Sequence, residues 1–279
     1  MRKFIIIPAR YASTRLPGKP LAKIAGHTML ERVISVAYQA IQGITDWTIA
    51  VATEDDRIMD YCLGIDVQCL MTSDKCRTGS DRVLEAAKML KAQPEDIVFS
   101  LQGDAPFVPP VILQKVLAEF EENEDARVVT PVVNLTWKQL DGLRAQKLET
   151  PFSGTTAVVD KDNRALWFSK NIMPAMRNEK RLREQMEHTP ILQHLGLYGY
   201  KFSTLQEFHR LPEGVYERLE GLEQLRFIEN GIPIHAVLLE SSLDRAQSGI
   251  DSPEDIIRAE GVIDKYGDPF VPLPKLLGK

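Results

Sequence analysis

Cysteine is scarce in this sequence, and its pattern excludes two common kinds of site. The 279 residues contain only Cys62, Cys69 and Cys76. Their odd number and their spacing of seven residues match neither a disulfide framework nor the closely paired cysteines of a zinc site. We therefore expect reduced thiols in a cytoplasmic protein.

Long apolar runs and an excess of basic residues are missing as well. No segment approaches the length of a membrane-spanning helix. The apolar run after Arg2 and Lys3 is cut short by Pro8 and Arg10, which argues against a secretory signal. Lysine and arginine number 34 against 39 acidic residues, so the net charge is −5, whereas a nucleic-acid-binding protein would normally be basic. We expect a cytoplasmic protein that binds neither nucleic acid nor a membrane.

The first hundred residues do contain a regular alternation of apolar strands and amphipathic helices. Strands are predicted at KFIII, WTIAVAT, DVQCLM and DIVFSLQGD. Helical spacing begins after Thr28, with Gly43 past its end, and recurs in EDDRIMDYCLG and SDRVLEAAKMLK. This alternation predicts an α/β fold with a doubly wound, mostly parallel sheet.

The alternation weakens after residue 133. GTTAVVDKDNRALWFSK predicts two strands joined by a polar turn, and HLGLYGYKF and PIHAVLL each predict one further strand. Helical patterns return in VYERLEGLEQLRFIENG, and a last helix is capped by Ser252 with Pro253 at its first position. The charged stretch RNEKRLREQMEH is predicted to be a solvated helix face. We expect one domain over residues 1–279, with a small inserted subdomain at about 134–200.

A cationic loop follows the first predicted strand. PARYASTRLPGKPL places Arg10, Arg15 and Lys19 within ten residues, and it matches neither GxGxxG nor the P-loop. Ligands of parallel sheets bind outside the carboxyl ends of the strands, where this loop begins. Three cations before a helix N-terminus favour a phosphorylated ligand. Basic surface residues that serve only solubility are the alternative interpretation.

Two aspartates follow other predicted turns. Asp104 closes the QGD turn after a strand, and Asp251 lies in GIDSPED before the last helix. Mg²⁺ prefers one or two carboxylates together with water and substrate phosphate oxygens. The pair therefore predicts a magnesium site that bridges the protein and the phosphates. A role for Asp251 as a helix cap or as the neighbour of a cap is the alternative.

Six motifs, taken together and in order, resemble those of one enzyme family. PARYASTRLPGKPL, TGSDR, QGDAP, HLGLYGY, LEGLEQLR and GIDSPED resemble signature segments of the 3-deoxy-manno-octulosonate (KDO) cytidylyltransferases, also called CMP-KDO synthetases. The resemblance covers residues 4 to about 260. It implies a nucleotide-diphospho-sugar transferase fold and a cytoplasmic, Mg²⁺-dependent homodimer. Such an enzyme transfers CMP from CTP to an acidic eight-carbon sugar for lipopolysaccharide biosynthesis and releases pyrophosphate.

The same resemblance implies roles for individual residues. Arg10, Arg15 and Lys19 would be catalytic, by neutralising the departing pyrophosphate, and Asp104 and Asp251 would hold the metal. The nucleotide would lie against Pro8, Ala9, Arg10, Arg15, Lys19, Thr78, Ser80, Arg82 and Gln102. The sugar would contact Gln102, Lys170, His194, Tyr198, Glu223 and Gln224. The subdomain at about 134–200 would bind the sugar and form the dimer interface.

Three departures from the family pattern bear on the choice of sugar. The family typically has QGDEP and FSR, where this chain has Ala105 and Lys170, and a lysine expected near Thr156 is missing. A lysine offers a point charge where arginine offers a planar fork of donors. Loss of a nearby lysine would ease the entry of a cationic substituent. We therefore predict a preference for 8-amino-3,8-dideoxy-manno-octulosonate, with KDO itself as the alternative.

Two functions of other classes compete with this interpretation. Asp160, Lys161 and Asp162 spell the DxD of metal-dependent glycosyltransferases, but they fall between two predicted strands, where a hairpin turn explains them. A non-catalytic nucleotide-sugar sensor is the second competitor, although a sensor has no need of a cationic clamp for a leaving group. Release of pyrophosphate from CTP would separate an enzyme from a sensor.

Overall fold

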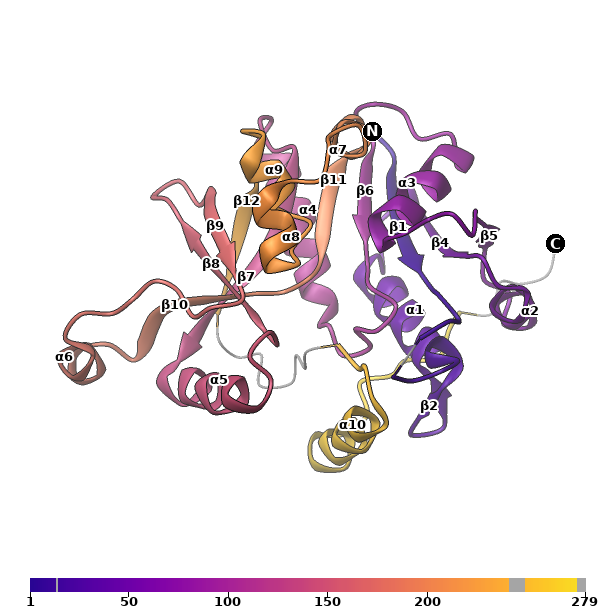
Figure 1. Cartoon of the computed structure of the whole chain (residues 1–279). Coiled ribbons are helices and arrows are strands. Elements are labelled where there is room, and N and C mark those ends of the chain that lie inside the picture. The colour runs from indigo at the N-terminus through magenta and orange to yellow at the C-terminus, as the bar shows by residue number, and fades with distance from the viewer. Residues whose placement is uncertain (14, 241–248, 275–279) are drawn as a thin grey trace. The chain divides into compact units, whose positions relative to one another are not determined.

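The computed structural model describes residues 1–13, 15–240 and 249–274. By its internal contacts the chain forms two compact units (Figure 1). Unit 1 consists of Met1–Gln114, Gly199–Gln206 and the C-terminal segment that carries the last helix. Unit 2 consists of Lys115–Tyr198 and Glu207–Asp244, and the predicted subdomain at about 134–200 falls almost wholly within it.

Unit 1 is built on a parallel sheet, as the sequence predicts. Its strands are β1 (Lys3–Pro8), β4 (Trp47–Thr53), β5 (Cys69–Met71) and β6 (Ile97–Ser100), with β11 (Tyr198–Lys201) beside β6. β1 pairs in parallel with both β4 and β6, and β4 pairs in parallel with β5. Residues 5–7 of β1 are completely buried, because both faces of this strand are covered, and this explains the unbroken apolar run.

Two helices of unit 1 begin at the capping residues that the sequence predicts. The remaining elements of this unit are η1 (Lys19–Leu21), β2 (Lys23–Ile24), β3 (His27–Thr28), α1 (Met29–Ala40), α2 (Asp56–Gly64), α3 (Gly79–Met89), α7 (Phe202–Phe208) and α10 (Pro253–Tyr266). Thr28 Oγ1 accepts a hydrogen bond from the Glu31 N–H at 3.1 Å. Ser252 Oγ accepts one from the Asp255 N–H at 3.3 Å. Both predicted caps are confirmed, and each satisfies a backbone donor that the first turn leaves unpaired.

A small apolar core in unit 1 joins the segments that carry the predicted site. It buries Ile24, Met29, Phe107, Ile250 and Ala259, against which Leu16, Ile256 and Ile263 pack. Leu16 belongs to the cationic loop, Phe107 follows the QGD turn, and Ile250 precedes Asp251. Burying a large apolar side chain stabilises the fold by about 1.5–3 kcal/mol. The same burial therefore fixes where these three distant segments meet.

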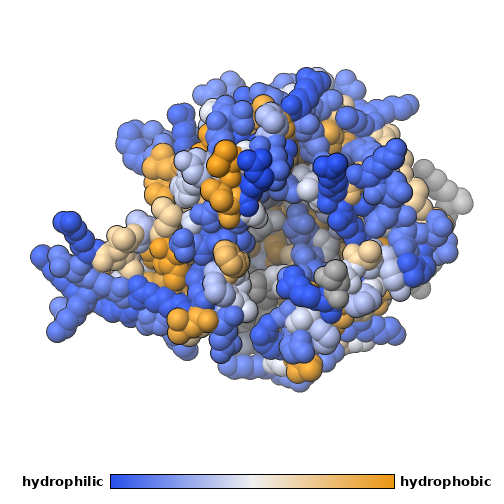
Figure 2. Space-filling view, in the orientation of Figure 1, coloured by the Kyte–Doolittle hydropathy of each residue, from blue (hydrophilic) through white to orange (hydrophobic). Residues whose placement is uncertain are grey.

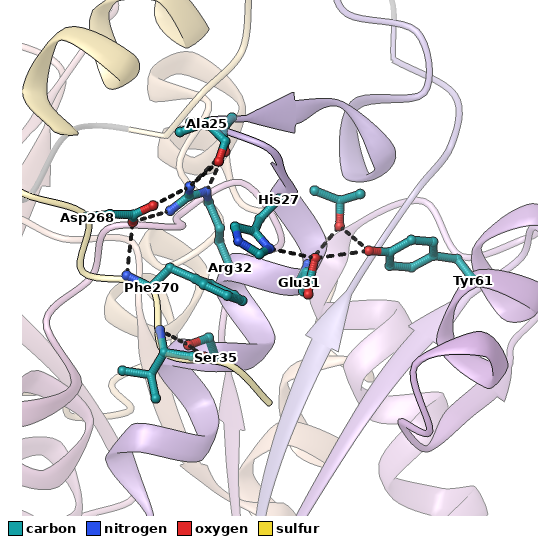
Figure 3. A network of polar contacts seen from close by, with 11 residues as sticks. Ala25, His27, Glu31, Arg32, Ser35, Tyr61, Asp268 and Phe270 are labelled. Atoms are coloured by element: carbon teal, nitrogen blue, oxygen red, sulfur yellow. Dashed lines mark hydrogen bonds and ion pairs between the residues drawn. The ribbon is translucent and has the colours of Figure 1, made fainter. Parts of the chain in front are cut away.

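The segment after α10 returns to α1 and forms what we call the C-terminal strap, residues 268–271 (Figure 3). Arg32 of α1 is 2% exposed and donates to both carboxylate oxygens of Asp268, at 2.7 and 2.9 Å. The rings of His27 and Phe270 stack with their centroids 3.8 Å apart. Ser35 Oγ donates to the carbonyl of Val271 at 2.7 Å. The strap therefore pins the C-terminal end of α10 to α1.

Unit 2 has a mixed sheet with mainly antiparallel pairs. Its strands are β7 (Val128–Thr136), β8 (Thr155–Val159), β9 (Ala165–Ser169), β10 (His188–His194) and β12 (His235–Leu239). Its helices are α5 (Trp137–Glu149), α6 (Glu179–Gln185), α8 (Val215–Glu220) and α9 (Leu225–Glu229), and the boundary between the units falls inside α4 (Pro110–Glu122). β10 pairs antiparallel with β7 and β8, and β8 pairs antiparallel with β9. Only β12 runs parallel to its neighbour β7 among the pairs described in this unit.

One predicted strand is divided in the structure, and one predicted helical stretch forms two helices. HLGLYGYKF is predicted as one strand, but β10 ends at His194 and β11 begins at Tyr198. The helical patterns predicted in VYERLEGLEQLRFIENG correspond to two helices, α8 and α9, and α8 ends before Gly221, which has a φ of 63°. Glycine adopts this left-handed conformation without a steric penalty and ends α8 there. The prediction of one strand is therefore wrong, and the prediction of helical structure is confirmed.

The polar turn and the charged stretch take the predicted forms. Asp160 Oδ1 accepts hydrogen bonds from the N–H groups of Asp162 and Arg164, both at 2.8 Å, in the turn between β8 and β9. The DxD sequence is thus a hairpin turn. RNEKRLREQMEH contains α6, in which no residue is buried, and Figure 2 shows hydrophilic residues over the arm that carries α6 in Figure 1. Among the described residues, no helix has the length and apolar character needed to cross a bilayer.

Candidate functional site

The cationic loop leaves the carboxyl end of β1 and is tied to its neighbours. The Ala9 N–H donates to the carbonyl of Ala52, after which β4 ends, at 2.9 Å. Arg10 donates to the carbonyl of Cys76, just before α3. A Cβ on Gly103 would lie 2.7 Å from the carbonyl oxygen of Pro8, so only glycine fits the QGD turn against the end of β1. The loop, the start of α3 and the QGD turn are therefore gathered at one edge of the parallel sheet.

Lys19 lies between the two predicted metal ligands. Its Nζ is 2.8 Å from Asp104 Oδ2 and 2.9 Å from Asp251 Oδ1. Arg15 Nη2 is 3.0 Å from the other oxygen of Asp251. The side chain of Lys19 is 13% exposed and that of Arg15 is 67% exposed. One largely buried ammonium therefore contacts both carboxylates, while Arg15 remains open to a ligand.

The backbone holds Asp251 against Asp104. The Ile250 N–H donates to the carbonyl of Asp104 at 2.9 Å, and a Cβ on Gly249 would lie 3.2 Å from the Asp104 carboxyl carbon. The cap of α10 is Ser252, so Asp251 is the neighbour of the cap, and its N–H donates to Asp255 Oδ2 at 2.9 Å. The carboxylate of Asp251 takes no part in this cap and pairs with Lys19 and Arg15.

Asp104 and Asp251 fit the donor set that Mg²⁺ prefers. Two carboxylates that already contact one ammonium lie close enough to share a cation. Within the described parts of the chain, no group of three or more His, Cys, Asp or Glu side chains is arranged to hold a metal. A metal on this pair would therefore take its other ligands from water and phosphate, as Mg²⁺ does and a structural Zn²⁺ does not.

The TGSDR segment forms the start of α3 beside Gln102. Thr78 is the N-cap, and its Oγ1 lies 2.9 Å from Ser80 Oγ. A Cβ on Gly79 would lie 3.5 Å from Gln102 Oε1 and 3.6 Å from Pro8 Cγ. The N-terminus of α3, with its partial positive charge, is therefore near the ends of β1 and β6. Four predicted nucleotide residues come together here: Pro8, Thr78, Ser80 and Gln102.

Arg82 differs from the rest of this segment because its side chain is buried. It is 1% exposed, and its guanidinium pairs with Glu54 at 2.5 Å and donates to Thr72 Oγ1 at 2.5 Å. A guanidinium so enclosed braces α3 against the segments that follow β4 and β5. We place Arg82 behind the predicted nucleotide residues, as a support for them.

In unit 2, Lys170, His194 and Tyr198 form a second polar group. The rings of His194 and Tyr198 have centroids 5.4 Å apart, and His194 Nε2 is 3.0 Å from Thr130 Oγ1. Burial, followed by the positive charge of Lys170, lowers the pKa of His194 to about 3. Burial also lowers the pKa of Lys170, an effect that the carboxylate of Glu220 opposes. His194 is therefore neutral near pH 7 and offers a hydrogen bond without a charge.

The other predicted sugar residues are distributed over both units. Glu223 and Gln224 lie in the turn between α8 and α9, where their carbonyls accept from the N–H groups of Arg226 and Phe227 at 3.1 and 3.2 Å. Gln102 belongs to unit 1. The structure thus groups Lys170, His194 and Tyr198 closely, places Glu223 and Gln224 together in one turn of unit 2, and places Gln102 in unit 1.

Comparison with known proteins decides the family. The cytidylyltransferase family profile matches residues 4–238. The chain belongs to the cytidylyltransferase family. It is 41% identical over 268 residues to the 3-deoxy-manno-octulosonate cytidylyltransferase of Maricaulis maris, covering 96% of this chain and 99% of that relative. It is 38% identical over 260 residues to the protein of the same name from Parabacteroides distasonis, covering 93% and 97%.

Solved structures agree with this assignment of the cytidylyltransferase. A CMP:2-keto-3-deoxy-manno-octonic acid synthetase complexed with CTP matches it with a TM-score of 0.79 and 28% identity, over 95% of this chain and 99% of that chain. A cytidylyltransferase from Leptospira borgpetersenii shares the fold at a TM-score of 0.56 and 18% identity, over 95% and 88%. The predicted α/β fold and the predicted enzyme class, a nucleotidyltransferase, are confirmed.

Thr156 of this cytidylyltransferase, where the family pattern leads us to expect a lysine, is fully buried. Its Oγ1 donates to the carbonyl of Asn171 at 2.6 Å and accepts from the Met173 N–H at 3.1 Å. The hydroxyl braces the backbone after β9 and does not line an open space. One of the three departures that favoured the 8-amino sugar therefore has a structural explanation.

Two residues that the sequence interpretation missed hold the backbone at Lys170 of the cytidylyltransferase. Lys147 Nζ donates to the Lys170 carbonyl at 2.6 Å, and Glu220 Oε2 accepts from the Lys170 N–H at 2.8 Å. Glu220 lies within LEGLEQLR, so the motif itself contained a signal. Lys147 lies on α5, whose few buried residues give no motif from which to find it.

Proposed function

We propose that this cytidylyltransferase transfers CMP from CTP to KDO, releases pyrophosphate, and serves lipopolysaccharide biosynthesis. The relatives at 41% and 38% identity carry the name of the KDO enzyme, which supports KDO over its 8-amino analogue as the acceptor. The observation that carries the proposal is Lys19, whose ammonium contacts both Asp104 and Asp251. A non-catalytic sensor needs no such concentration of charge. The glycosyltransferase alternative depended on the DxD sequence, which is explained as a hairpin turn.

In the proposed reaction the anomeric hydroxyl of the sugar attacks the α-phosphorus of CTP. A new phosphorus–oxygen bond forms, the bond to the pyrophosphate oxygen breaks, and the hydroxyl loses its proton. Negative charge grows on the departing pyrophosphate. Arg10, Arg15 and Lys19 would stabilise that charge, because cations held in place need no reorganisation as it develops. The nucleotide would lie along Pro8, Ala9, Thr78, Ser80 and Gln102, with Arg82 behind them.

Asp104 and Asp251 would hold Mg²⁺ in this proposal. When bound, the metal supplies positive charge to the phosphates and orients them. The carboxylates would then no longer depend on Lys19 as their counter-charge. The ammonium of Lys19 would become available to the phosphate oxygens.

The sugar side of the proposal lies mainly in unit 2. The cationic Lys170 suits the sugar carboxylate, and the neutral His194 suits a hydroxyl group. Tyr198, Glu223 and Gln224 would contact the remaining hydroxyls. We also propose a homodimer whose interface lies within about 134–200, which light scattering after size exclusion tests.

The enzymatic test is pyrophosphate release from CTP with Mg²⁺ and either KDO or 8-amino-3,8-dideoxy-manno-octulosonate. We expect a higher kcat/KM for KDO at saturating CTP. A higher value for the amino sugar would restore the preference predicted from Ala105, Lys170 and Thr156. Absence of pyrophosphate with both sugars, in protein that still binds CTP, would identify a sensor.

A further inference from the structure

The backbone at Lys170 is held from two sides within unit 2. Glu220, at the end of α8, accepts from the Lys170 N–H and from Ser169 Oγ, both at 2.8 Å. Lys147, in the last turn of α5, donates to the Lys170 carbonyl at 2.6 Å. Strand β9 ends at Ser169, so these contacts replace sheet pairing at the next residue. Hydrogen bonds to charged groups are about twice as strong as neutral ones, which makes this a firm hold.

Lys147 also binds the loop that enters β8. Its Nζ donates to the carbonyls of Ser153 at 2.5 Å and Gly154 at 3.1 Å. The next residue, Thr155, accepts a hydrogen bond from Lys170 Nζ at 3.2 Å. The contact between Lys170 Nζ and Thr155 orients the Lys170 side chain. The ammonium of Lys147 fixes the backbone of both partners, because it binds the carbonyl of Lys170 and the carbonyls of the two residues before Thr155.

The titratable groups around Lys170 come from four other elements. Glu220 of α8 is acidic and favours the charged form of Lys170, whereas burial disfavours it. Lys147 of α5 has a pKa lowered by burial and then by the charge of Lys170. His194 of β10 is neutral, and Tyr198 of β11 packs beside it. Among these neighbours Glu220 is the acid, so it preserves the charge of Lys170.

We infer that Glu220 and Lys147 are positioning residues that present Lys170 as the cation for the sugar carboxylate. The inference rests on the proposed function, in which Lys170 contacts the acidic sugar. Lys147 acts by fixing the backbone of Lys170 and of the residues before Thr155. Glu220 acts by fixing the Lys170 N–H and by preserving the charge. Neither side chain needs to touch the sugar, and both belong to unit 2, whereas the predicted CTP residues belong to unit 1.

The test measures the KM for KDO and the KM for CTP separately in Glu220→Gln and Lys147→Met. We expect each substitution to raise the KM for KDO about ten-fold, which corresponds to about 1.4 kcal/mol, and to leave the KM for CTP nearly unchanged. Glu213→Gln and Lys138→Met, at exposed positions before α8 and on α5, are the matched controls and should resemble the wild type. Lys147→Arg and Glu220→Asp keep the charges and should raise the KM for KDO less.

A pH series adds a readout that a purely structural role would not move. Without its acidic neighbour, Lys170 loses its proton at a lower pH. The rise in the KM for KDO on the alkaline side should therefore begin at a lower pH in Glu220→Gln than in the wild type. An unshifted rise, or unchanged KM values for KDO in both variants, would overturn the inference.

Lys170→Met separates this inference from the proposed function. We expect it to raise the KM for KDO more than either positioning variant does. If Lys170→Met leaves that KM unchanged, the proposed role of Lys170 fails and the inference fails with it. If Lys170→Met raises the KM while Glu220→Gln, Lys147→Met and their charge-keeping counterparts behave as wild type, only the inference is overturned. Thermal unfolding identifies variants that fail to fold, for which Lys147→Arg and Glu220→Asp carry the comparison.

Discussion

The residues of the unit 1 site are arranged around one ammonium. The side chains of Asp104 and Asp251 are 35% and 41% exposed, whereas that of Lys19 is 13% exposed. Two unit charges about 4 Å apart interact by about 4 kcal/mol at an effective dielectric constant near 20. The carboxylates are thus paired on their inner side and open to solvent on the other. On the proposed function, a metal and the phosphates of CTP would approach the carboxylates from that open side.

Asp104→Asn and Asp251→Asn are each expected to lower kcat about 10²–10³-fold, the range for removing one group that stabilises charge in a transition state. A carboxamide does not replace a carboxylate as a ligand of Mg²⁺. The measurement is the initial rate of pyrophosphate release across a Mg²⁺ titration, with thermal unfolding to establish that the variants are folded. Asp162→Asn, in the hairpin turn, is the control and should keep the wild-type rate. A wild-type rate in either site variant would refute the metal assignment.

A sequence motif predicts the position of a site residue well when the residues that hold it in place are close to it in the sequence. Asp104 and Lys19 stand in turns that glycine and proline fix locally, so sequence places them at strand ends. Lys147 is different, because its carbonyl partners at 153, 154 and 170 approach it only in the folded unit. Arg82 illustrates the converse: it stands in a motif, yet its side chain is buried and paired with Glu54.

At the scale of elements, the QGD turn depends on the absence of a side chain at Gly103. We expect Gly103→Ala to lower the free energy of unfolding by about 1–3 kcal/mol, because its Cβ would lie 2.7 Å from the Pro8 carbonyl and one of the two strand ends must move. Urea unfolding measures this. Turnover should fall as well, since both strand ends carry predicted site residues.

Gly261→Ala is the matched control for this prediction. Gly261 lies in the middle of α10, and a Cβ there meets nothing within 4 Å. Alanine is favoured over glycine in a helix interior by up to about 1 kcal/mol, so this variant should be as stable as the wild type or more stable. Equal losses of stability in Gly103→Ala and Gly261→Ala would contradict the steric argument.

Helices and strands whose apolar residues follow one clear periodicity could be predicted from the sequence. Elements without such a periodicity could not. The strands and helices of unit 1 follow from continuous apolar runs and from helical spacing between caps. In α5 only Leu140 and Leu143 are buried, so no apolar stripe marks it as a helix. The break between β10 and β11 lies at residues 195–197, where the aliphatic residues favour a strand but Gly196 does not. The aliphatic and aromatic residues on both sides of Gly196 therefore concealed the end of the strand.

The largest-scale feature that the sequence did not predict is how the chain is divided. Unit 1 draws on three separate stretches of the chain, and residues 199–206 return to it from the middle of unit 2. No local pattern in those eight residues encodes that return. The family, in contrast, could be identified from the order of the six motifs, because that order is kept whatever the division.

At the scale of the whole molecule, the C-terminal strap should make the free energy of unfolding depend on pH. Hydrogen bonds from Arg32 are the main cause that lowers the pKa of Asp268. A carboxyl group with a lowered pKa in the folded state contributes stability that is complete above its unfolded value, about 3.9, and is lost as the pH falls through the folded value. We expect Asp268→Asn to lose about 1.5–3 kcal/mol of unfolding free energy at pH 7, because it leaves the buried Arg32 without its charged partner.

Urea unfolding of wild type and Asp268→Asn at a series of pH values measures this difference. The difference should be constant from pH 7 to about 5 and should shrink below about pH 4. Asp264→Asn, at an exposed position on α10, is the control and should show no such change. A difference that stays the same down to pH 3 would contradict the role of the ion pair.

The contact between Lys19 and Asp251 spans 232 residues of the chain. During synthesis the cationic loop and Asp104 leave the ribosome long before Asp251 does. A copy that is interrupted before residue 250 therefore has the cations that attract a nucleotide but only one of the two carboxylates. Such a copy also lacks Ile250 and Ala259, which belong to the apolar core that holds the cationic loop. On the proposed function, turnover is therefore confined to copies whose synthesis has passed the start of α10.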